Sequence, residues 1–139
     1  MPTTGEKHRT FRRLHEAGCF VIPNPWDVGT TRYLQHLGFK ALATTSAGAA
    51  FALGLPDGLV SRNAMLAHIK AIVAASELPV NADFQSGYAK TSGEIGENVR
   101  LCIGTGVAGL SIEDSTGERA PPLYELDEAV ERIRAARAA

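Results

Sequence analysis

The sequence lacks several features that would point directly to a function class. It holds only 2 cysteines in 139 residues, and two thiols alone make neither a disulfide-rich scaffold nor a structural zinc site. The formal net charge of -1 gives no electrostatic reason to expect nucleic acid or an anionic membrane as a partner. No apolar run approaches the ~20 residues of a membrane-spanning helix, and residues 1–6 lack the apolar core of a secretory signal. We therefore expect a cytoplasmic protein with no nucleic-acid or membrane partner.

What the sequence does contain is an alternation of short apolar runs with longer helical patterns. The apolar runs predict strands over 19–22, 41–44, 79–83 and 107–113. Helical spacing predicts a polar helix that ends at Ala17, followed by helices capped by Asp27, Ser61 and Ser92. A last helix is predicted over 127–138, with Ala129, Val130 and Ile133 facing inward. Both cysteines, Cys19 and Cys102, lie in apolar contexts that predict core positions.

Four strand-then-helix units in succession predict an α/β fold with parallel strands, because each helix returns the chain to the same end of the sheet. The pattern leaves two architectures open, a doubly wound open sheet and part of a (β/α)8 TIM barrel. No G-x-G-x-x-G follows the first predicted strand, which weighs against the dinucleotide-binding open sheet. A full barrel needs roughly 250 residues, so a single domain over residues 1–139 with about four βα units would be about half of one. The pattern alone does not decide between the two architectures.

Polar side chains gather where the predicted strands end, which is where parallel α/β folds carry out chemistry. Asp83 and Gln85 follow the third strand, and Glu113 ends the fourth. Carboxylate and amide oxygens at adjacent strand ends are suitable ligands for Mg²⁺, which commonly uses one or two carboxylates and keeps water. A carboxylate here is also often just the N-cap of the next helix. Ser46 lies in a small-residue loop, 45–48, whose backbone N–H groups suit an anion or oxyanion.

Taken as a set, four stretches resemble the isocitrate lyase/phosphoenolpyruvate mutase superfamily, in particular its phosphonomutase-like members. They are PNPWDVGTTRYL (23–34), ALATTSAGAAFALGLPDG (41–58), LPVNADFQSGYA (78–89) and VAGLSIEDSTG (107–117). The resemblance implies the first half of a (β/α)8 barrel and a lyase-type enzyme that binds a small-molecule α-oxo acid, or its enolate, on Mg²⁺. Such enzymes make or break the neighbouring C–C or P–C bond, and the family habit is a homo-oligomer.

The resemblance also implies roles for individual residues. Asp83 would bind the metal and contact the substrate, Gln85 would be a neutral metal ligand, and Glu113 would complete the metal shell through water. Ser46, with the backbone of Ala47 and Gly48, would hold the substrate carboxylate and oxyanion. Asp57 would lie on the mobile gating loop and, like Ser46, take part in catalysis.

Three departures from the family pattern narrow this expectation. Gln85 stands where the family often has a second acid, and 117–122 lacks the catalytic cysteine of the lyase branch. The family's later strands, with a substrate-binding arginine, lie beyond the 139 residues. A decarboxylase, hydrolase or mutase-like activity therefore fits better than a methylisocitrate-type lyase. The alternative is a truncated, non-catalytic half-barrel that is stable only as an oligomer.

Overall fold

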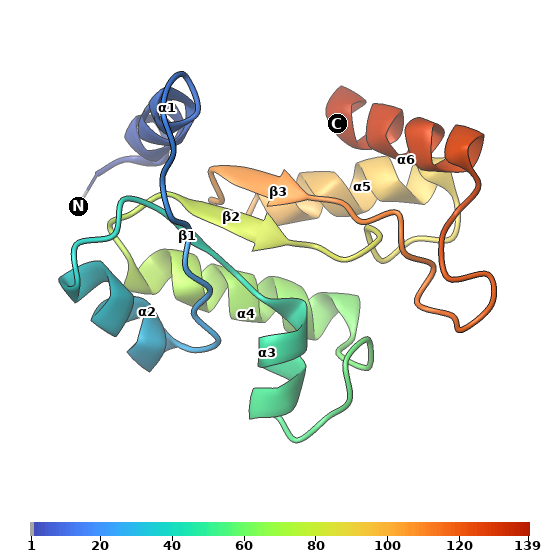
Figure 1. Ribbon diagram of the computed structural model, residues 1–139, viewed down its shortest axis with the longest axis horizontal. Helices are drawn as coiled ribbons and strands as arrows, with labels where there is room; N and C mark the ends of the chain where they lie inside the picture. Colours follow the sequence, from blue (N-terminus) through green and yellow to red (C-terminus); the bar gives the residue numbers. More distant parts are fainter. Residues whose placement is uncertain (1) are drawn as a thin grey trace.

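Each strand of the protein is followed by at least one helix that returns the chain, so the strands run parallel, as predicted (Figure 1). The computed structural model describes residues 2–139, and within these residues it has a three-stranded sheet in the order β1-β2-β3. The strands are β1 (Leu42–Ala43), β2 (Val80–Asp83) and β3 (Gly109–Ser111). The helices are α1 (Thr4–Leu14), α2 (Val28–His36), α3 (Ser46–Ala52), α4 (Arg62–Ala75), α5 (Ser92–Ile103) and α6 (Leu126–Ala138).

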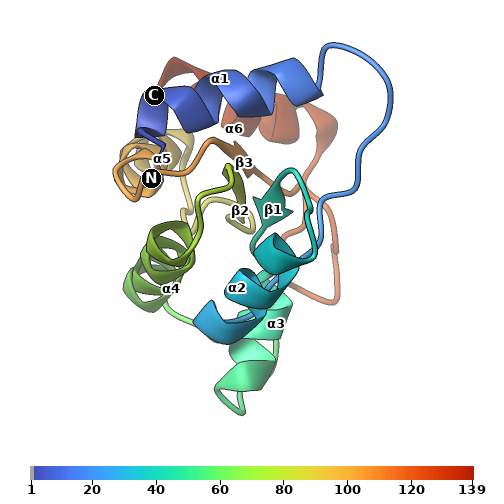
Figure 2. The same cartoon turned by 90° about the vertical axis from the view of Figure 1, so that its left-hand side faces the viewer.

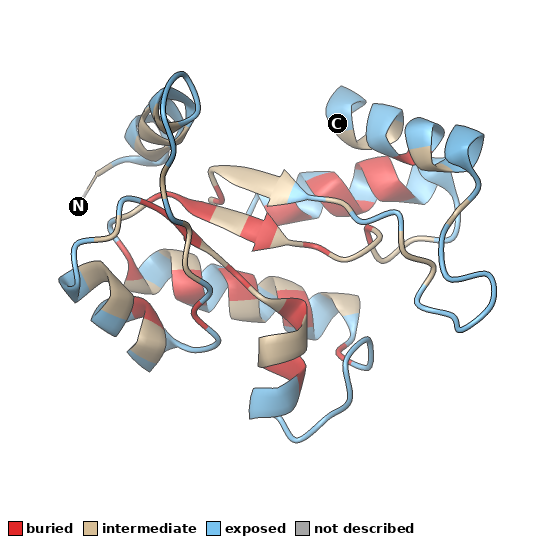
Figure 3. Ribbon diagram, in the orientation of Figure 1, coloured by how far each residue is buried: buried red, intermediate tan, exposed pale blue. Residues whose placement is uncertain are grey.

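One face of this sheet packs on α4 and α5 and forms the core. Met65 and Ile69 of α4, Ala82 and Phe84 at β2, and Cys102 of α5 are fully buried in one cluster. Figure 3 shows the buried stripes of α4 and α5 turned toward the strands. The alternate side chains of β2, Asn81 and Asp83, face the other way and stay partly exposed. The alternation of the strand therefore separates an apolar core face from a polar face.

Helix α1 contributes no buried residue, yet it is tied to the sheet at the beginning of β3. A Cβ on Gly109 would lie 2.7 Å from the Phe11 ring and 2.9 Å from Asn81 Oδ1, so only glycine allows this close approach. Lys7 Nζ donates to the Ser76 carbonyl at 2.6 Å, just past the end of α4. Helix α1 thus lies across the β3 side of the sheet, at the end opposite the strand carboxyl ends (Figure 2).

The predicted helix starts are largely confirmed. The Asp27 carboxylate accepts from the Thr30 N–H at 2.6 Å, and Ser61 Oγ accepts from the Ala64 N–H at 3.4 Å. At α5 the predicted cap is wrong by one residue. Thr91, not Ser92, has extended backbone and accepts from the Glu94 N–H, while the Glu94 carboxylate accepts from the Thr91 N–H in return. This reciprocal capping box favours threonine three residues before a glutamate.

Two backbone predictions are wrong. Residues 19–22 form no strand. Pro23 and Pro25, which follow them, have no N–H to donate to a neighbouring strand. The backbone hydrogen bond that joins this region to β1 runs from the Ala43 N–H to Pro23 O. The predicted loop 45–48 is instead the start of α3, since the Thr45 hydroxyl caps the Gly48 N–H at 3.1 Å.

Two side-chain predictions are also wrong. Cys19 is exposed, as its segment lies outside the sheet, whereas Cys102 is buried as expected. On α6, Val130 is 37% and Ile133 is 46% exposed, and the buried residue is Arg132. The helix turns its arginine toward the loop after β2, and the two apolar side chains lie beside Ile112 at the β3 edge of the sheet. Among the described residues no helix is long and apolar enough to cross a membrane.

Candidate functional site

A cavity of about 440 Å³ lies at the carboxyl ends of the strands. The chain segment that directly follows each strand contributes to it, and four of the predicted site residues, Ser46, Asp57, Gln85 and Glu113, line it together. The other lining residues are Gly58, Leu59, Ser86, Ser115, Thr116, Gly117 and Glu118. The topology thus gathers side chains that are far apart in the sequence, because parallel strands end on one edge.

Asp83 is fixed at the end of β2 by three hydrogen bonds. Its Oδ2 accepts from the Ser46 N–H at 2.6 Å, and its Oδ1 accepts from the Gln85 N–H at 3.3 Å. Its own N–H donates to Thr44 Oγ1 at 2.9 Å. The carboxylate is therefore oriented before any ligand arrives, beside the positive N-terminal end of α3.

Neither Asp83 nor Glu113 is the cap of the helix that follows it. Thr91 caps α5, and Glu125 occupies the N-cap position of α6 without a side-chain bond. The alternative interpretation, in which these strand-end acids are ordinary caps, therefore does not apply. Glu113 lines the cavity, whereas Asp83 is not among its lining residues and accepts from the Ser46 and Gln85 N–H groups behind it.

Glu113 lies in a negative environment. Although Glu113 is exposed as a residue, partial desolvation of its carboxyl raises the pKa above the ordinary value, and the charges of Asp83, Asp57 and Asp114 raise it further. Its backbone N–H donates to the Gln85 carbonyl at 2.8 Å, which sets Glu113 beside the loop after β2. These negative charges disfavour ionisation of Glu113, and a cation placed among them would relieve the repulsion.

The donor set at this edge fits Mg²⁺ better than a softer metal. Asp83, Gln85 and Glu113 offer oxygen atoms, which Mg²⁺ prefers, and it fills the rest of its shell with water. Within residues 2–139 no three His, Cys, Asp or Glu side chains form a ready-made metal cage. The residues therefore suit a hydrated hard cation that is completed by water or by a ligand.

Of the groups predicted to hold an anionic substrate, two already have partners in the chain. The Ser46 N–H donates to Asp83, and the Gly48 N–H donates to the Thr45 hydroxyl. Gly48 has no room for a side chain, since a Cβ would lie 2.6 Å from Thr45 Cγ2 and 3.2 Å from Trp26 Cβ. Ser46 itself lines the cavity, whereas Ala47 and Gly48 do not.

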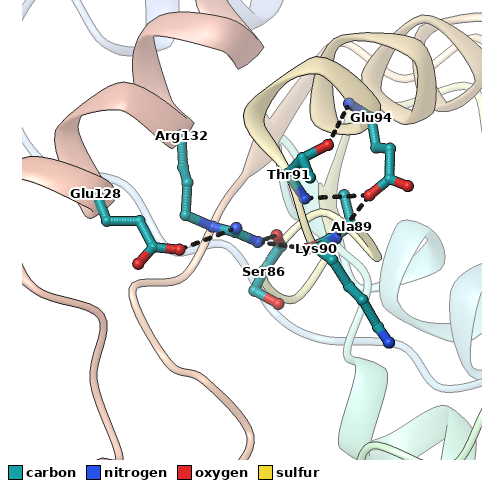
Figure 4. Close-up of polar contacts among 7 residues, drawn as sticks. All are labelled: Ser86, Ala89, Lys90, Thr91, Glu94, Glu128 and Arg132. Carbon is teal, nitrogen blue, oxygen red and sulfur yellow. Dashed lines mark hydrogen bonds and ion pairs between the residues drawn. The ribbon is translucent and has the colours of Figure 1, made fainter.

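The loop after β2, residues 84–91, is held by side chains from α5 and α6 that the sequence pattern does not indicate. We call it the held loop. Gln85 and Tyr88 have φ of 46° and 53°, a left-handed conformation that costs non-glycine residues about 1–3 kcal/mol each. Asn98 Nδ2 donates to Gly87 O and Tyr88 O, both at 2.9 Å. Arg132 Nη2 donates to Ser86 O at 2.7 Å and to Ala89 O at 2.8 Å (Figure 4). The one sequence signal was an arginine at helical spacing among the inward-facing alanines of α6.

Tyr88 is the other residue of note in this loop. Its ring packs on Phe84, and its hydroxyl is buried without a hydrogen-bond partner among the described residues. Burial raises the pKa of the phenol, and the charges of Asp83, Asp57 and Glu113 add to the rise. The Tyr88 phenol therefore keeps its proton beside the acids of the site.

Comparison with known proteins gives consistent matches. The sequence profile of the phosphoenolpyruvate phosphomutase family matches residues 11–139. The fold is similar to a crystal structure of a candidate lyase/mutase from Burkholderia cenocepacia J2315, with a TM-score of 0.93 and 50% identity, covering 96% of this chain and 48% of that one. It also resembles oxaloacetate acetylhydrolase in complex with oxalate, with a TM-score of 0.85 and 32% identity, covering 95% of this chain and 48% of that one.

A curated relative is 2-methylisocitrate lyase of Escherichia coli (strain K12), 33% identical over 110 residues, which are 73% of this chain and 37% of the relative. The chain thus spans less than half the length of these similar proteins.

Proposed function

The chain belongs to the isocitrate lyase/phosphoenolpyruvate mutase superfamily, and from that premise we propose that it forms part of a Mg²⁺-dependent enzyme. The enzyme would act on the C–C or P–C bond of an α-oxo acid through an enolate. The observation that carries the proposal is the acidic cavity at the strand ends, where the charges of Asp83 and Asp57 raise the pKa of Glu113. Strands β1 to β3 would be part of a (β/α)8 barrel.

The proposed metal ligands are Asp83, Gln85 and Glu113, some of them acting through water. When bound, the cation would supply a Lewis acid that stabilises negative charge on the oxo-acid oxygen. The chain's own contribution begins with Asp83, which two backbone N–H groups already orient. Because its position is fixed in advance, little reorganisation is needed when the metal and substrate bind.

Ser46 and Asp57 are the proposed residues on the substrate side. Ser46 lines the cavity together with Gln85 and Glu113, and its hydroxyl would orient the substrate carboxylate. Of the backbone groups predicted beside it, the Gly48 N–H already donates to Thr45, which leaves that of Ala47 for the substrate. Asp57 faces the same cavity from an exposed turn, where it could hold or move a proton next to the reacting carbon. Oxalate bound to oxaloacetate acetylhydrolase supports a small dicarboxylate or oxo acid as the ligand class.

The position of the thiols favours a decarboxylase, hydrolase or mutase-like reaction over a thiol-dependent lyase. Cys102 is buried in α5, where burial raises the pKa of its thiol to about 12, and Cys19 lies in the exposed segment after α1. Neither lines the cavity. Residues 117–122, which correspond to the cysteine-bearing loop of the lyase branch, hold no cysteine and are exposed.

The test is consumption of oxaloacetate and of phosphonopyruvate by the full-length natural protein, with Mg²⁺ and with EDTA. Asp83→Ala should lower turnover at least about 100-fold, since even outer-shell partners of a metal cost 10–100-fold. Asp83→Asn, which keeps the shape, should do the same, and Asp127→Ala on exposed α6 serves as the matched control. Absence of wild-type turnover on any α-oxo acid would exclude the enzyme, and equal turnover by the Asp83 variants would exclude the metal assignment.

A second candidate is a non-catalytic half-barrel that is stable only as a homo-oligomer. An apolar groove of about 470 Å³ beside β3, lined by Leu110, Ile112 and Ile133, favours it, because such a surface needs a cover. The native mass of the natural protein distinguishes the two. A chain of this length that is stable, oligomeric and inactive toward oxo acids would support the second candidate.

A further inference from the structure

Arg132 is the most buried charged side chain of the described residues, and nothing in the proposed reaction uses it directly. It is 2% exposed, although it lies on α6, a helix whose other residues are all partly or fully exposed. A buried arginine is costly unless its charge is compensated. Its nearest carboxylate, Glu128 Oε1, lies 3.7 Å away and is half exposed, so the ion pair compensates only part of that cost.

The guanidinium is compensated mainly by the held loop. One nitrogen, Nη2, donates to Ser86 O and Ala89 O, which are 46 and 43 residues away in the sequence. The face of the guanidinium lies 4.1 Å from the centre of the Tyr124 ring. Figure 4 shows the side chain reaching from α6 to both ends of the turn at residues 86–89.

Arg132 and its neighbours supply donors to the successive carbonyls of the held loop. The carbonyls of Gly87 and Tyr88 accept from Asn98, and the Gln85 carbonyl accepts from the Glu113 N–H. Every carbonyl from residue 85 to residue 89 therefore has a donor. The side chains of Gln85 and Ser86 are left to line the cavity.

We propose that Arg132 is a positioning residue for the metal and oxo-acid site, acting through the backbone of the held loop. This inference rests on the proposed function, because it assigns Arg132 a role toward the ligands bound there. By clamping Ser86 O and Ala89 O, Arg132 keeps Gln85 in its left-handed conformation. In this conformation the Gln85 N–H donates to Asp83 and the Gln85 carbonyl accepts from the Glu113 N–H. Lysine should not replace it, because an ammonium has no planar face to stack on Tyr124 and no second nitrogen for Glu128 while the first holds the two carbonyls.

The test measures binding rather than turnover, in the full-length natural protein. Calorimetry gives the Kd of Mg²⁺ and then of oxalate in the presence of Mg²⁺, for wild type, Arg132→Lys and Arg132→Ala. We expect the Mg²⁺ and oxalate affinities of both variants to fall about 10–100-fold, the usual effect of losing an outer-shell partner. Arg134→Lys and Arg134→Ala are the matched controls, because Arg134 lies on the exposed side of the same helix, and both should bind like wild type.

Two further readouts separate positioning from a loss of folding. Amide hydrogen exchange should speed up at residues 85–89 in Arg132→Lys while the core of α4 stays protected. Guanidinium ion, but not sodium, should restore Mg²⁺ affinity to Arg132→Ala. Unchanged Kd in a folded Arg132→Lys would overturn the proposal, as would loss of affinity only in proportion to global unfolding. If wild type binds neither Mg²⁺ nor oxalate, the proposed function fails and this inference fails with it.

Discussion

Two segments face the same cavity but are held in different ways. In the held loop, residues 84–89 are buried or half-buried, and side chains from α5 and α6 hold their carbonyls. In the turn at residues 53–60, which we call the free turn, every residue except Val60 is exposed (Figure 3). The hydrogen bonds recorded for residues 53–59 all end within residues 50–59, such as Leu55 N–H to Ala50 O and Leu59 N–H to Pro56 O.

This difference separates two tasks of one site. The held loop carries Gln85 and lies beside the two strand-end acids, so the proposed metal ligands come from the rigid part of the fold. The free turn carries Asp57, and few buried contacts together with local hydrogen bonds are the marks of a segment that opens at low cost. A rigid metal edge facing a movable acid suits a reaction in which the substrate must enter and then be enclosed.

The largest effect on the free energy of unfolding should come from removing the side chain of α5 that binds the held loop. Asn98→Ala removes the donors to Gly87 O and Tyr88 O and the acceptor for Arg62 Nη1 at 2.7 Å. Leaving buried polar groups unpaired should lower the free energy of unfolding by about 2–3 kcal/mol. Urea unfolding checks this, with exposed Asn63→Ala on α4 as control. A loss equal to that of the control would mean that the loop is not held by Asn98.

An intermediate effect should come from pH, through Glu113. Its pKa is raised above the ordinary value of 4.5. Between the ordinary and the raised pKa the unfolded carboxyl is ionised while the folded one keeps its proton, so stability falls as pH rises through that window. Thermal unfolding without metal should show this fall, and Glu113→Gln should reduce it.

Mg²⁺ should reverse the trend, because it binds the ionised carboxylate. Its affinity should rise with pH through the same window, and Glu113→Gln should flatten the rise. A Mg²⁺ affinity that does not change with pH across this window in the wild type would contradict the assignment of Glu113 to the metal shell.

The smallest effect on stability, with a large effect on function, is expected in the free turn. Asp57→Asn keeps an acceptor for the Gly58 N–H, which the Asp57 carboxylate binds at 2.8 Å. The free energy of unfolding should change by less than about 0.5 kcal/mol, as for other exposed positions. Turnover of the oxo acid should nevertheless fall about 100-fold if Asp57 transfers a proton. Steady-state kinetics beside urea unfolding checks both, and unchanged turnover would remove Asp57 from the catalytic residues.

Much of this arrangement could be predicted from local sequence. The β2 and β3 strands, the caps at Asp27 and Ser61, and the gathering of Ser46, Gln85 and Glu113 at one edge follow from periodicity and from the direction of parallel strands. The strand predicted over 19–22 is absent, because strand pairing needs backbone N–H donors and the prolines that follow this segment have none. The inward face of α6 was predicted from apolar side chains, whereas a buried arginine occupies it.

The sequence by itself determined the α/β alternation, the strand-end acids and the family, because these depend on periodicity and on motifs a few residues long. Only the tertiary structure decided that Arg132 and Asn98 hold the loop of Gln85, and that Asp57 faces the same cavity from a turn without such support. The physical reason is that these contacts join segments about 10 to 46 residues apart. Every residue type has a backbone carbonyl. The identity of the residue that accepts such a bond therefore does not reveal in the sequence that a distant side chain binds it.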